Sequence, residues 1–342
     1  MGSLKNAMVL ILSEQDVAGV LQMADGVRLV ERAFRDHANG QSLLIPRVSQ
    51  DLPNGGGAFR IMPAVLPSRN WFGLKTLTGF PGRRLPGETY FAVLLFEMET
   101  GALRAVVAGS HLTGVRTGAA SGVAAKYLAR DNAEVLGVFG AGVQARHQVA
   151  ALVEVRPVKM VKVFDRNKPK AAAFVDMIRK DHGIDACVSP GGKETVIGSD
   201  LLVTATTSRE PLFSGDWLEP GTHLSGMGSN APGKRELDKT CFSRSKVVVD
   251  FKEQALEESG DLRHAIESGA ITPDKIHAEL GEIVTDRKVG RQNDDEITLF
   301  KSVGVAIEDI ATAAFAYEKA IATGVGTYLQ LDSIGADVLV GR

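Results

Sequence analysis

The stretch Val135–Ala145 (VLGVFGAGVQA) constrains the fold of this chain more than any other. Its apolar residues 135–139 predict a buried strand, and a helix is predicted to follow through residue 153. Gly140, Gly142 and Ala145 have the spacing G-x-G-x-x-A. The first N–H groups of a helix that begins at such a turn are unpaired and lie at the positive end of the helix dipole. The pattern predicts a turn that binds the pyrophosphate of a dinucleotide, and an ordinary strand, turn and helix is the alternative.

A second predicted strand, Val158–Phe164, ends at Asp165. In dinucleotide-binding folds an acidic residue about 20 or more positions after the first glycine binds the ribose hydroxyls. Asp165 favours NAD, because a carboxylate repels the 2′-phosphate of NADP. Arg166 and Asn167 weaken this preference, since an arginine just beyond the strand can receive that phosphate. We expect NAD as the cofactor, with NADP as the alternative.

The order of predicted elements divides the chain into two kinds of structure. From Glu134 onward strands and helices alternate, which predicts a parallel sheet with helices on both faces. Before this point the chain has a helix at 23–38 and strand-like runs at 71–78, 90–97 and 103–108. The predicted fold class is α/β, with a Rossmann-type parallel-sheet domain beside a mostly antiparallel α+β domain. A last helix, 302–323, is expected to pack against the N-terminal domain.

Composition limits the partners and the location. The formal net charge of −2 argues against nucleic acid held by bulk electrostatics. No apolar run approaches the roughly 18 residues of a membrane span. The N-terminus has no signal-like cleavage site, and Cys187 and Cys241 are too far apart for a C-x-x-C motif. We therefore expect a cytoplasmic protein that binds neither nucleic acid nor membrane, and we predict no metal site.

Three cationic residues lie among apolar residues of the sequence, before the point where strands and helices begin to alternate: Arg47, Lys75 and Arg116. For any single one, a solvated surface charge is the simpler interpretation. A cleft that contained all three would suit a carboxylate substrate, because arginine binds carboxylates through two parallel hydrogen bonds. A desolvated lysine near other cations could also transfer protons.

An ordered set of motifs extends over nearly the whole chain: 45–47 (IPR), 73–75 (GLK), 116–120 (RTGAA), 140–145 (GAGVQA), 228–234 (GSNAPGK) and 300–304 (FKSVG). This set resembles the ornithine cyclodeaminase/mu-crystallin family. The resemblance implies a substrate-binding and dimerisation domain of residues 1–115 and 305–342, and an NAD(P)-binding Rossmann domain of residues 116–304. It also implies a homodimer that acts on small imino or amino acids.

The resemblance also implies roles for individual residues. Arg47, Lys75 and Arg116 would hold the substrate carboxylate, and Lys75 would assist proton transfer. The nicotinamide side of the cofactor would meet Thr89, Arg116, Thr117, Met227 and Gly228. The rest of the dinucleotide would be held by Gly140, Gly142, Val143, Gln144, Asp165, Arg166, Thr204, Ala205 and Thr206. Ser302 and Gly304 would close the site.

Asn230 departs from the family pattern, because cyclodeaminases have an aspartate there that handles the side-chain amine of the substrate. An amide cannot take up a proton at neutral pH. The expected function is therefore an NAD(P)H-dependent reductase of a 2-imino acid, in which Asn230 is a fourth candidate catalytic residue. The alternatives are an alanine dehydrogenase-like enzyme, a cyclodeaminase with recycled NAD, and a non-catalytic ligand-binding protein like mu-crystallin. Arg83 and Arg84 could attract a second carboxylate, as in iminosuccinate.

Overall fold

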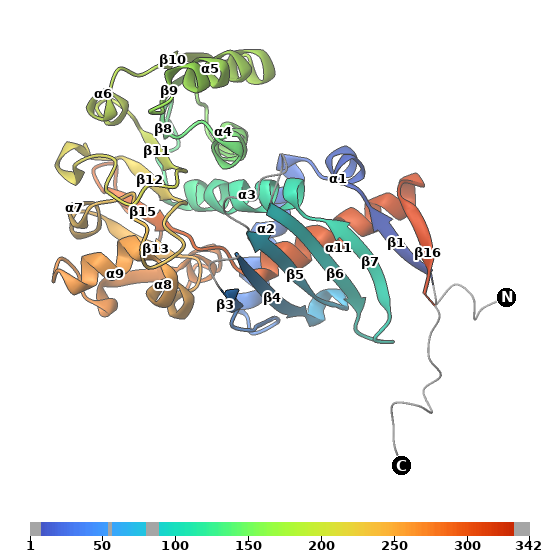
Figure 1. The fold of residues 1–342 in the computed structure, drawn as a ribbon. Coiled ribbons are helices and arrows are strands. Elements are labelled where there is room, and N and C mark those ends of the chain that lie inside the picture. The colour runs from blue at the N-terminus through green and yellow to red at the C-terminus, as the bar shows by residue number, and fades with distance from the viewer. Residues whose placement is uncertain (1–7, 54–56, 80–88, 332–342) are drawn as a thin grey trace. The chain divides into compact units, whose positions relative to one another are not determined.

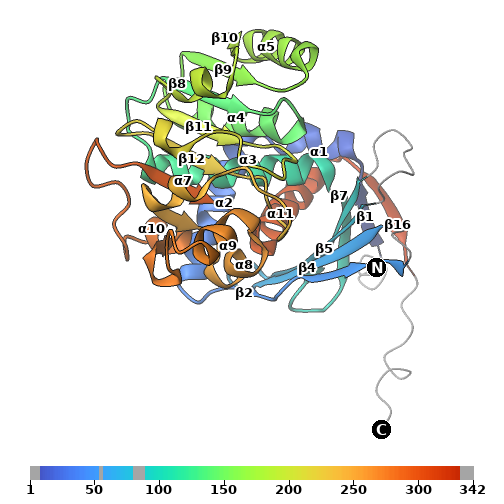
Figure 2. The same ribbon diagram turned by 60° about the vertical axis from the view of Figure 1, so that its left-hand side comes forward.

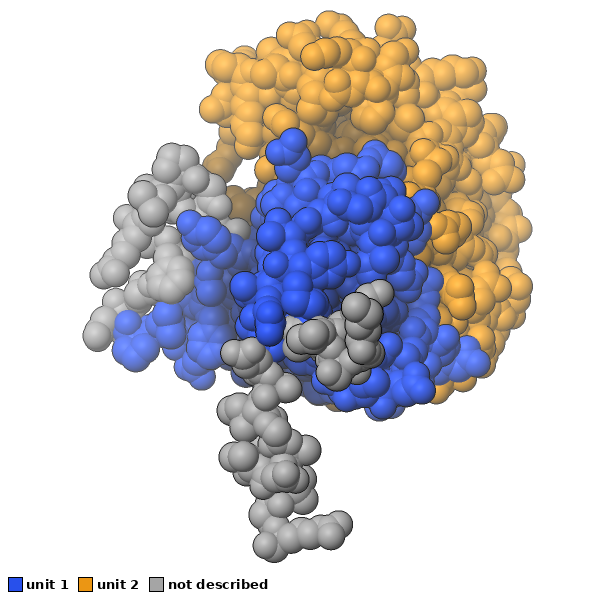
Figure 3. Space-filling model, turned by 90° about the vertical axis from the view of Figure 1, so that its right-hand side faces the viewer, with its two compact units in different colours: residues 1–22, 41–113, 309–342 blue, residues 23–40, 114–308 orange. Residues whose placement is uncertain are grey.

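The computed structural model describes residues 8–53, 57–79 and 89–331, and these divide into two compact units. Unit 1 contains residues 1–22, 41–113 and 309–342, and unit 2 contains residues 23–40 and 114–308 (Figure 3). The helix of residues 23–38, which we expected in the N-terminal domain, belongs to unit 2. No helix of the described residues is long and apolar enough to cross a membrane.

Unit 2 is built on a parallel sheet with strand order β10-β9-β8-β11-β12-β15-β13-β14 (Figure 2). The strands are β8 (Val135–Phe139), β9 (Met160–Phe164), β10 (Asp185–Val188), β11 (Leu201–Thr204), β12 (His223–Gly226), β13 (Lys246–Val249), β14 (Ile276–Glu279) and β15 (Thr298–Lys301). The order places the first strand, β8, beside the fourth, β11. This is the point of a Rossmann-type sheet at which the strand order reverses and where ligands bind.

Helices cover both faces of this sheet. Successive residues of a strand point to opposite faces, so one strand contributes to two cores. Leu136 and Val138 of β8 pack in a core with α4 (Val143–Val155) and α5 (Lys168–His182). Phe139, the last residue of β8, packs in the core of the other face, with α7 (Lys239–Ser243) and α9 (Gly260–Glu267). The expected α/β class is confirmed. The remaining helices of this unit are α2 (Met23–Ala38), α6 (Gly192–Val196), α8 (Lys252–Glu258) and α10 (Leu280–Val284).

The glycines of α3 (Ser110–Leu128) allow a close helix contact within unit 2. A Cβ atom on Gly114 would lie 2.3 Å from the ring of His147, and one on Gly118 would lie 2.4 Å from the His147 carbonyl oxygen. The absence of side chains lets the backbones of α3 and α4 approach each other. This contact fixes the turn of α3 that carries Arg116 against the helix that begins at the glycine-rich turn.

Unit 1 contains the mixed, mostly antiparallel sheet, with strand order β16-β1-β7-β6-β5-β4-β2 and β3 paired to β4. Its strands are β1 (Met8–Leu12), β2 (Leu43–Leu44), β3 (Val48–Asp51), β4 (Ala58–Leu66), β5 (Trp71–Gly79), β6 (Thr89–Glu97), β7 (Leu103–Ala108) and β16 (Thr327–Gln330). Only β1 and β7 pair in parallel. The short helix α1 (Glu14–Val20) begins at a capping box formed by Ser13 and Asp16.

One face of this sheet packs against α11 (Ala306–Thr323) from residue 309 onward (Figure 1). Ile310 meets Gly73 of β5, and the ring of Tyr317 meets that of Trp71 edge to face at 5.3 Å. The prediction that this helix begins at Ser302 was wrong. Residues 302–305 form an irregular segment instead, because Asp250 accepts hydrogen bonds from the backbone N–H groups of Val303 and Gly304.

Candidate active site

The glycine-rich turn has the geometry of a pyrophosphate cradle. Gly140 has φ +104°, and a Cβ there would lie 2.6 Å from the carbonyl oxygen of Ala205, so this position requires glycine. Gly142 is the N-cap of α4, and no side chain caps its N–H groups. A Cβ on Gly142 would meet only the Lys170 ammonium, at 3.9 Å. The residues of the turn therefore fit a dinucleotide, whose phosphates can approach this helix terminus.

Asp165 follows β9 and supports the same turn. Its carboxylate accepts hydrogen bonds from the N–H of Ala141 at 3.0 Å and from that of Asn167 at 2.8 Å. Beyond it, Arg166, Lys168 and Lys170 are exposed, and none of these three has an ion pair within the part of the chain that the structure describes. One carboxylate is therefore followed in the sequence by three exposed cations, at and just before the first turn of α5.

The predicted dinucleotide-contacting residues after β11 and β12 lie near this turn. Thr204 is the last residue of β11, Ala205 and Thr206 follow it next to Gly140, and Met227 and Gly228 follow β12. Met227 accepts a hydrogen bond from Ser121 of α3 at 3.1 Å. The Thr204 hydroxyl and the side-chain oxygen of Gln144 are buried without a hydrogen-bond partner among the described residues. These two buried polar atoms, of Thr204 and Gln144, are candidates for ligand contacts. Val143 is exposed at the start of α4.

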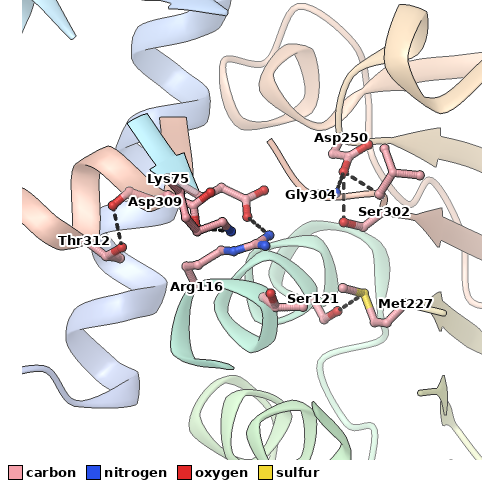
Figure 4. A network of polar contacts seen from close by, with 12 residues as sticks. Lys75, Arg116, Ser121, Met227, Asp250, Ser302, Gly304, Asp309 and Thr312 are labelled. Carbon is pink, nitrogen blue, oxygen red and sulfur yellow. Dashed lines mark hydrogen bonds and ion pairs between the residues drawn. The ribbon is translucent and has the colours of Figure 1, made fainter. Parts of the chain in front are cut away.

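Arg116 lies in α3 and forms an ion pair with Glu308, with its Nη1 atom 2.8 Å from the carboxylate (Figure 4). A Cβ on Gly304 would lie 2.4 Å from the same Nη1 atom, and Gly304 has φ +81°. Glycine is thus required where the segment 302–305 crosses the guanidinium. Thr117, the next residue of α3, is nearly buried, and its carbonyl accepts a hydrogen bond from Gln148 of α4.

Asp250 fixes the segment that crosses Arg116. The Asp250 carboxylate is 1% exposed. One of its oxygens accepts hydrogen bonds from the Ser302 hydroxyl at 2.9 Å, from Val303 N at 2.7 Å and from Gly304 N at 2.6 Å (Figure 4). Ser302 is itself buried, and its hydroxyl donates its hydrogen bond to this carboxylate. Our sequence reasoning did not identify Asp250, although it is the last residue of a predicted strand and thus lies at the edge where ligands bind.

Lys75 of β5 is fully buried and forms an ion pair with Asp309, which is also fully buried, at 2.8 Å (Figure 4). Its ammonium also lies 5.9 Å from the ring centre of Phe91. Asp309 was not predicted, since it is 234 residues away in the sequence. Glu308 and Asp309 are consecutive residues of α11, and each pairs with one of the predicted cations.

The strand register relates Arg47 to Lys75. Arg47 precedes β3, whose Val48 pairs with Ile61 of β4, and the next residue of β4, Met62, pairs with Lys75. Arg47 is half-buried at this level of the sheet. Thr89 is the first residue of β6, and its side chain is outside the described residues, as are Arg83 and Arg84.

Asn230 is half-buried in unit 2, and its side-chain oxygen accepts a hydrogen bond from Lys234 at 3.3 Å. Ser229 beside it has φ +58° and donates its hydroxyl to the carbonyl oxygen of Lys234 at 2.6 Å. The motif 228–234 is therefore a turn held by its own side chains. An amide at this position can donate and accept hydrogen bonds but cannot act as a base.

Comparisons with known proteins identify the family of this chain. The model of the ornithine cyclodeaminase/mu-crystallin family matches residues 7–324. An alanine dehydrogenase of Archaeoglobus fulgidus is 39% identical over 94% of this chain and 98% of its own. The structure of Thermococcus litoralis Delta(1)-pyrroline-2-carboxylate reductase in complex with NADH and L-proline is 42% identical and has a TM-score of 0.90, over 93% of this chain and 99% of that one.

An archaeal alanine dehydrogenase dimer with bound NAD is 38% identical and has a TM-score of 0.89, over 95% of this chain and 100% of that one. These similarities extend over both units, so the resemblance noted from the motifs holds for the whole architecture. On this evidence the chain belongs to the ornithine cyclodeaminase/mu-crystallin family.

Proposed function

We propose that the protein is an NAD(P)H-dependent reductase that converts a 2-imino acid into an L-amino acid. The observation that carries the proposal is the buried ion pair of Lys75 and Asp309. Removing two charges from water costs several kcal/mol per ion, and their mutual attraction often fails to repay it. A buried pair is thus a weak device for stability, and a proton donor at a reaction centre is the better explanation for it.

A bound dinucleotide supplies the hydride that goes to the carbon of the C=N bond. The chain supplies the proton and the orientation. Lys75 donates a proton to the imine nitrogen, directly or through a water molecule, and Asp309 holds its ammonium in place. Arg116 binds the substrate carboxylate through the planar fork of its guanidinium, which Glu308 orients, and Arg47 provides a second cation.

Lys75 and Arg116 are each held by a carboxylate of α11. Asp309 pairs with Lys75, and Glu308 pairs with Arg116. The family resemblance assigns both cations to the substrate carboxylate, and we propose these roles for Lys75 and Arg116.

The cations beyond β9 support use of NADPH as well as NADH. Asp165 is engaged by two backbone N–H groups of its own chain, whereas Arg166, Lys168 and Lys170 follow it closely in the sequence and are exposed. A 2′-phosphate carries about two negative charges near neutral pH. We propose that Arg166 and Lys170 receive it.

The turn at Asn230 favours reduction over cyclodeamination. The cyclodeaminase alternative needs a group that manages the side-chain amine of the substrate, and the amide of Asn230 cannot accept its proton. The relatives include a Delta(1)-pyrroline-2-carboxylate reductase and an alanine dehydrogenase. Both reactions interconvert C=N and CH–NH bonds, so the alanine dehydrogenase function remains the second candidate.

We also propose that the protein works in the cytoplasm and that it forms a homodimer. An archaeal alanine dehydrogenase relative is a dimer. Gly73 and Lys75 face α11, so Phe72 and Leu74 point to the other side of the sheet. There the ring of Phe72 stacks on that of Phe96, with centres 5.1 Å apart, and both residues are partly exposed. We expect Phe72→Asp to shift the mass in analytical ultracentrifugation from dimer to monomer. A wild-type monomer would contradict this proposal.

The experiment that tests the function is a panel of substrates with NADH and NADPH. It contains cyclic imines with a 2-carboxylate, 2-keto acids with ammonia or methylamine, and iminosuccinate. We expect oxidation of one equivalent of reduced dinucleotide per amino acid formed. A diamino acid with NAD completes the panel, and its release of ammonia without net change in the dinucleotide would instead identify a cyclodeaminase.

A further inference from the structure

A buried carboxylate, Glu236, connects two loops of unit 2 that the sequence analysis treated separately. Its Oε1 atom accepts a hydrogen bond from Thr206 N at 2.5 Å, and its Oε2 atom accepts one from Gly228 N at 2.7 Å. Thr206 follows β11, and Gly228 follows β12. Glu236 thus ties the loops at the carboxyl ends of two neighbouring parallel strands to one rigid group.

Two further buried charges hold Glu236. Asp261 accepts hydrogen bonds from the backbone N–H groups of Glu236 at 2.7 Å and of Leu237 at 3.1 Å. Lys301, at the end of β15, lies 3.4 Å from the other oxygen of Asp261 and donates to the carbonyl oxygens of Gly226 and Gly228. Glu236, Asp261 and Lys301 are all at most 1% exposed.

The contact with Gly228 depends on the absence of a side chain. A Cβ atom on Gly228 would lie 2.2 Å from the carboxyl carbon of Glu236. Because Gly228 has no side chain, its loop can approach the Glu236 carboxylate closely. Burial raises the pKa of the Glu236 carboxyl, and the charge of Lys301 opposes this effect. A loop, a helix and a strand each contribute one of these three buried charges, which is more than the packing of this sheet requires.

We propose that Glu236 is a positioning residue for the nicotinamide end of the dinucleotide, with Asp261 and Lys301 as its support. This inference rests on the proposed function and on the family resemblance, which implies that Met227 and Gly228 lie beside the nicotinamide. Glu236 holds the Gly228 loop against the Thr206 loop, which touches the glycine-rich turn through Ala205. The distance between the pyrophosphate and the nicotinamide sites is thereby fixed before the dinucleotide binds.

Binding of two ligands to Glu236→Gln tests the proposal. The amide keeps the size of the side chain, but its NH2 group opposes one of the two backbone N–H donors. ADP-ribose retains the adenosine, both phosphates and the second ribose, and lacks only the nicotinamide. Isothermal titration calorimetry should show that the variant binds NADH about tenfold or more weakly, while its Kd for ADP-ribose changes less than threefold.

Two variants make the result decisive. Glu267→Gln, on the exposed surface of α9, is the matched control and should bind both ligands as the wild type does. Gly228→Ala disturbs the same contact from the loop and should repeat the selective loss of NADH affinity, which keeps the test valid if Glu236→Gln does not fold.

Equal losses for both ligands, or no loss, would overturn the positioning role alone. A wild-type protein that bound neither ligand would overturn the proposed function, and this inference with it.

Discussion

The two units use different chemistry to prepare a binding site. The turn at Gly140 and Gly142 in unit 2 presents backbone N–H groups, and its essential features are a positive φ angle and missing Cβ atoms. The candidate substrate residues of unit 1 are side chains on a sheet, and Lys75 depends on a carboxylate 234 residues away. A backbone site is encoded locally, whereas a side-chain site is encoded by the fold. The two sites should therefore respond differently to mutation.

Lys75→Met should have the largest effect and should separate catalysis from cofactor binding. Loss of a general acid costs about 10²–10⁴-fold in rate, so kcat for imine reduction should fall in this range while the Kd of NADH stays within twofold. The single variant leaves the Asp309 charge buried and should be destabilised by about 3–5 kcal/mol. The double variant Lys75→Met/Asp309→Asn should recover stability in urea unfolding and remain inactive. Recovered activity would show that Lys75 is not the proton donor.

Two glycine variants should separate the effect of the glycine-rich turn on cofactor binding from its effect on stability. Gly142→Ala leaves the backbone unstrained, because φ is −87° and the new Cβ meets only the end of a lysine side chain. It should melt like the wild type but bind NADH about a hundredfold more weakly, because the methyl group occupies the path of the phosphates. Gly140→Ala should lose both stability and binding, since its Cβ would collide with a backbone carbonyl. Calorimetry and thermal melts would measure both, and normal NADH binding by Gly142→Ala would refute the cradle.

Arg166→Ala should change the choice of cofactor without changing catalysis. We expect KM for NADPH to rise about tenfold, because one charge-assisted contact to phosphate is lost, and KM for NADH to stay within twofold. Lys180→Ala, in the last turn of α5, the helix that begins just after Arg166, is the matched control. Equal changes for the two cofactors would show that the 2′-phosphate does not bind at Arg166.

His223 gives the smallest effect and concerns stability. It is fully buried between Thr298 and Ser225, and burial lowers its pKa to about 3. The unfolded chain takes up this proton near pH 6.5 and the folded protein does not. The contribution of His223 to the free energy of unfolding should thus be fully present above pH 6.5. As the pH drops toward 3, the free energy of unfolding should fall by up to about 1.4 kcal/mol per pH unit. Urea unfolding at pH 7, 6 and 5 should show this slope, and His223→Gln should remove that part of it.

The difference between the units also explains what the sequence could reveal. The helix at Met23–Ala38, the glycine-rich turn and the alternation of strands and helices depend on local patterns and were predicted. The partners Glu308 and Asp309 were not, because nothing near Arg116 or Lys75 in the sequence indicates them. The start of α11 was misplaced for a similar reason: Asp250 pulls residues 302–304 out of a helical pattern that the sequence alone favours.

The most direct test of the central claim follows one hydrogen atom. The best imino acid of the panel is incubated with NADH carrying deuterium at the reactive position of C4, and the product is examined by mass spectrometry. Hydride transfer to a C=N bond predicts one deuterium at the α-carbon of an L-amino acid and one equivalent of NAD formed. A product without deuterium, or ammonia released with the label still on the dinucleotide, would contradict the assignment as an imino acid reductase.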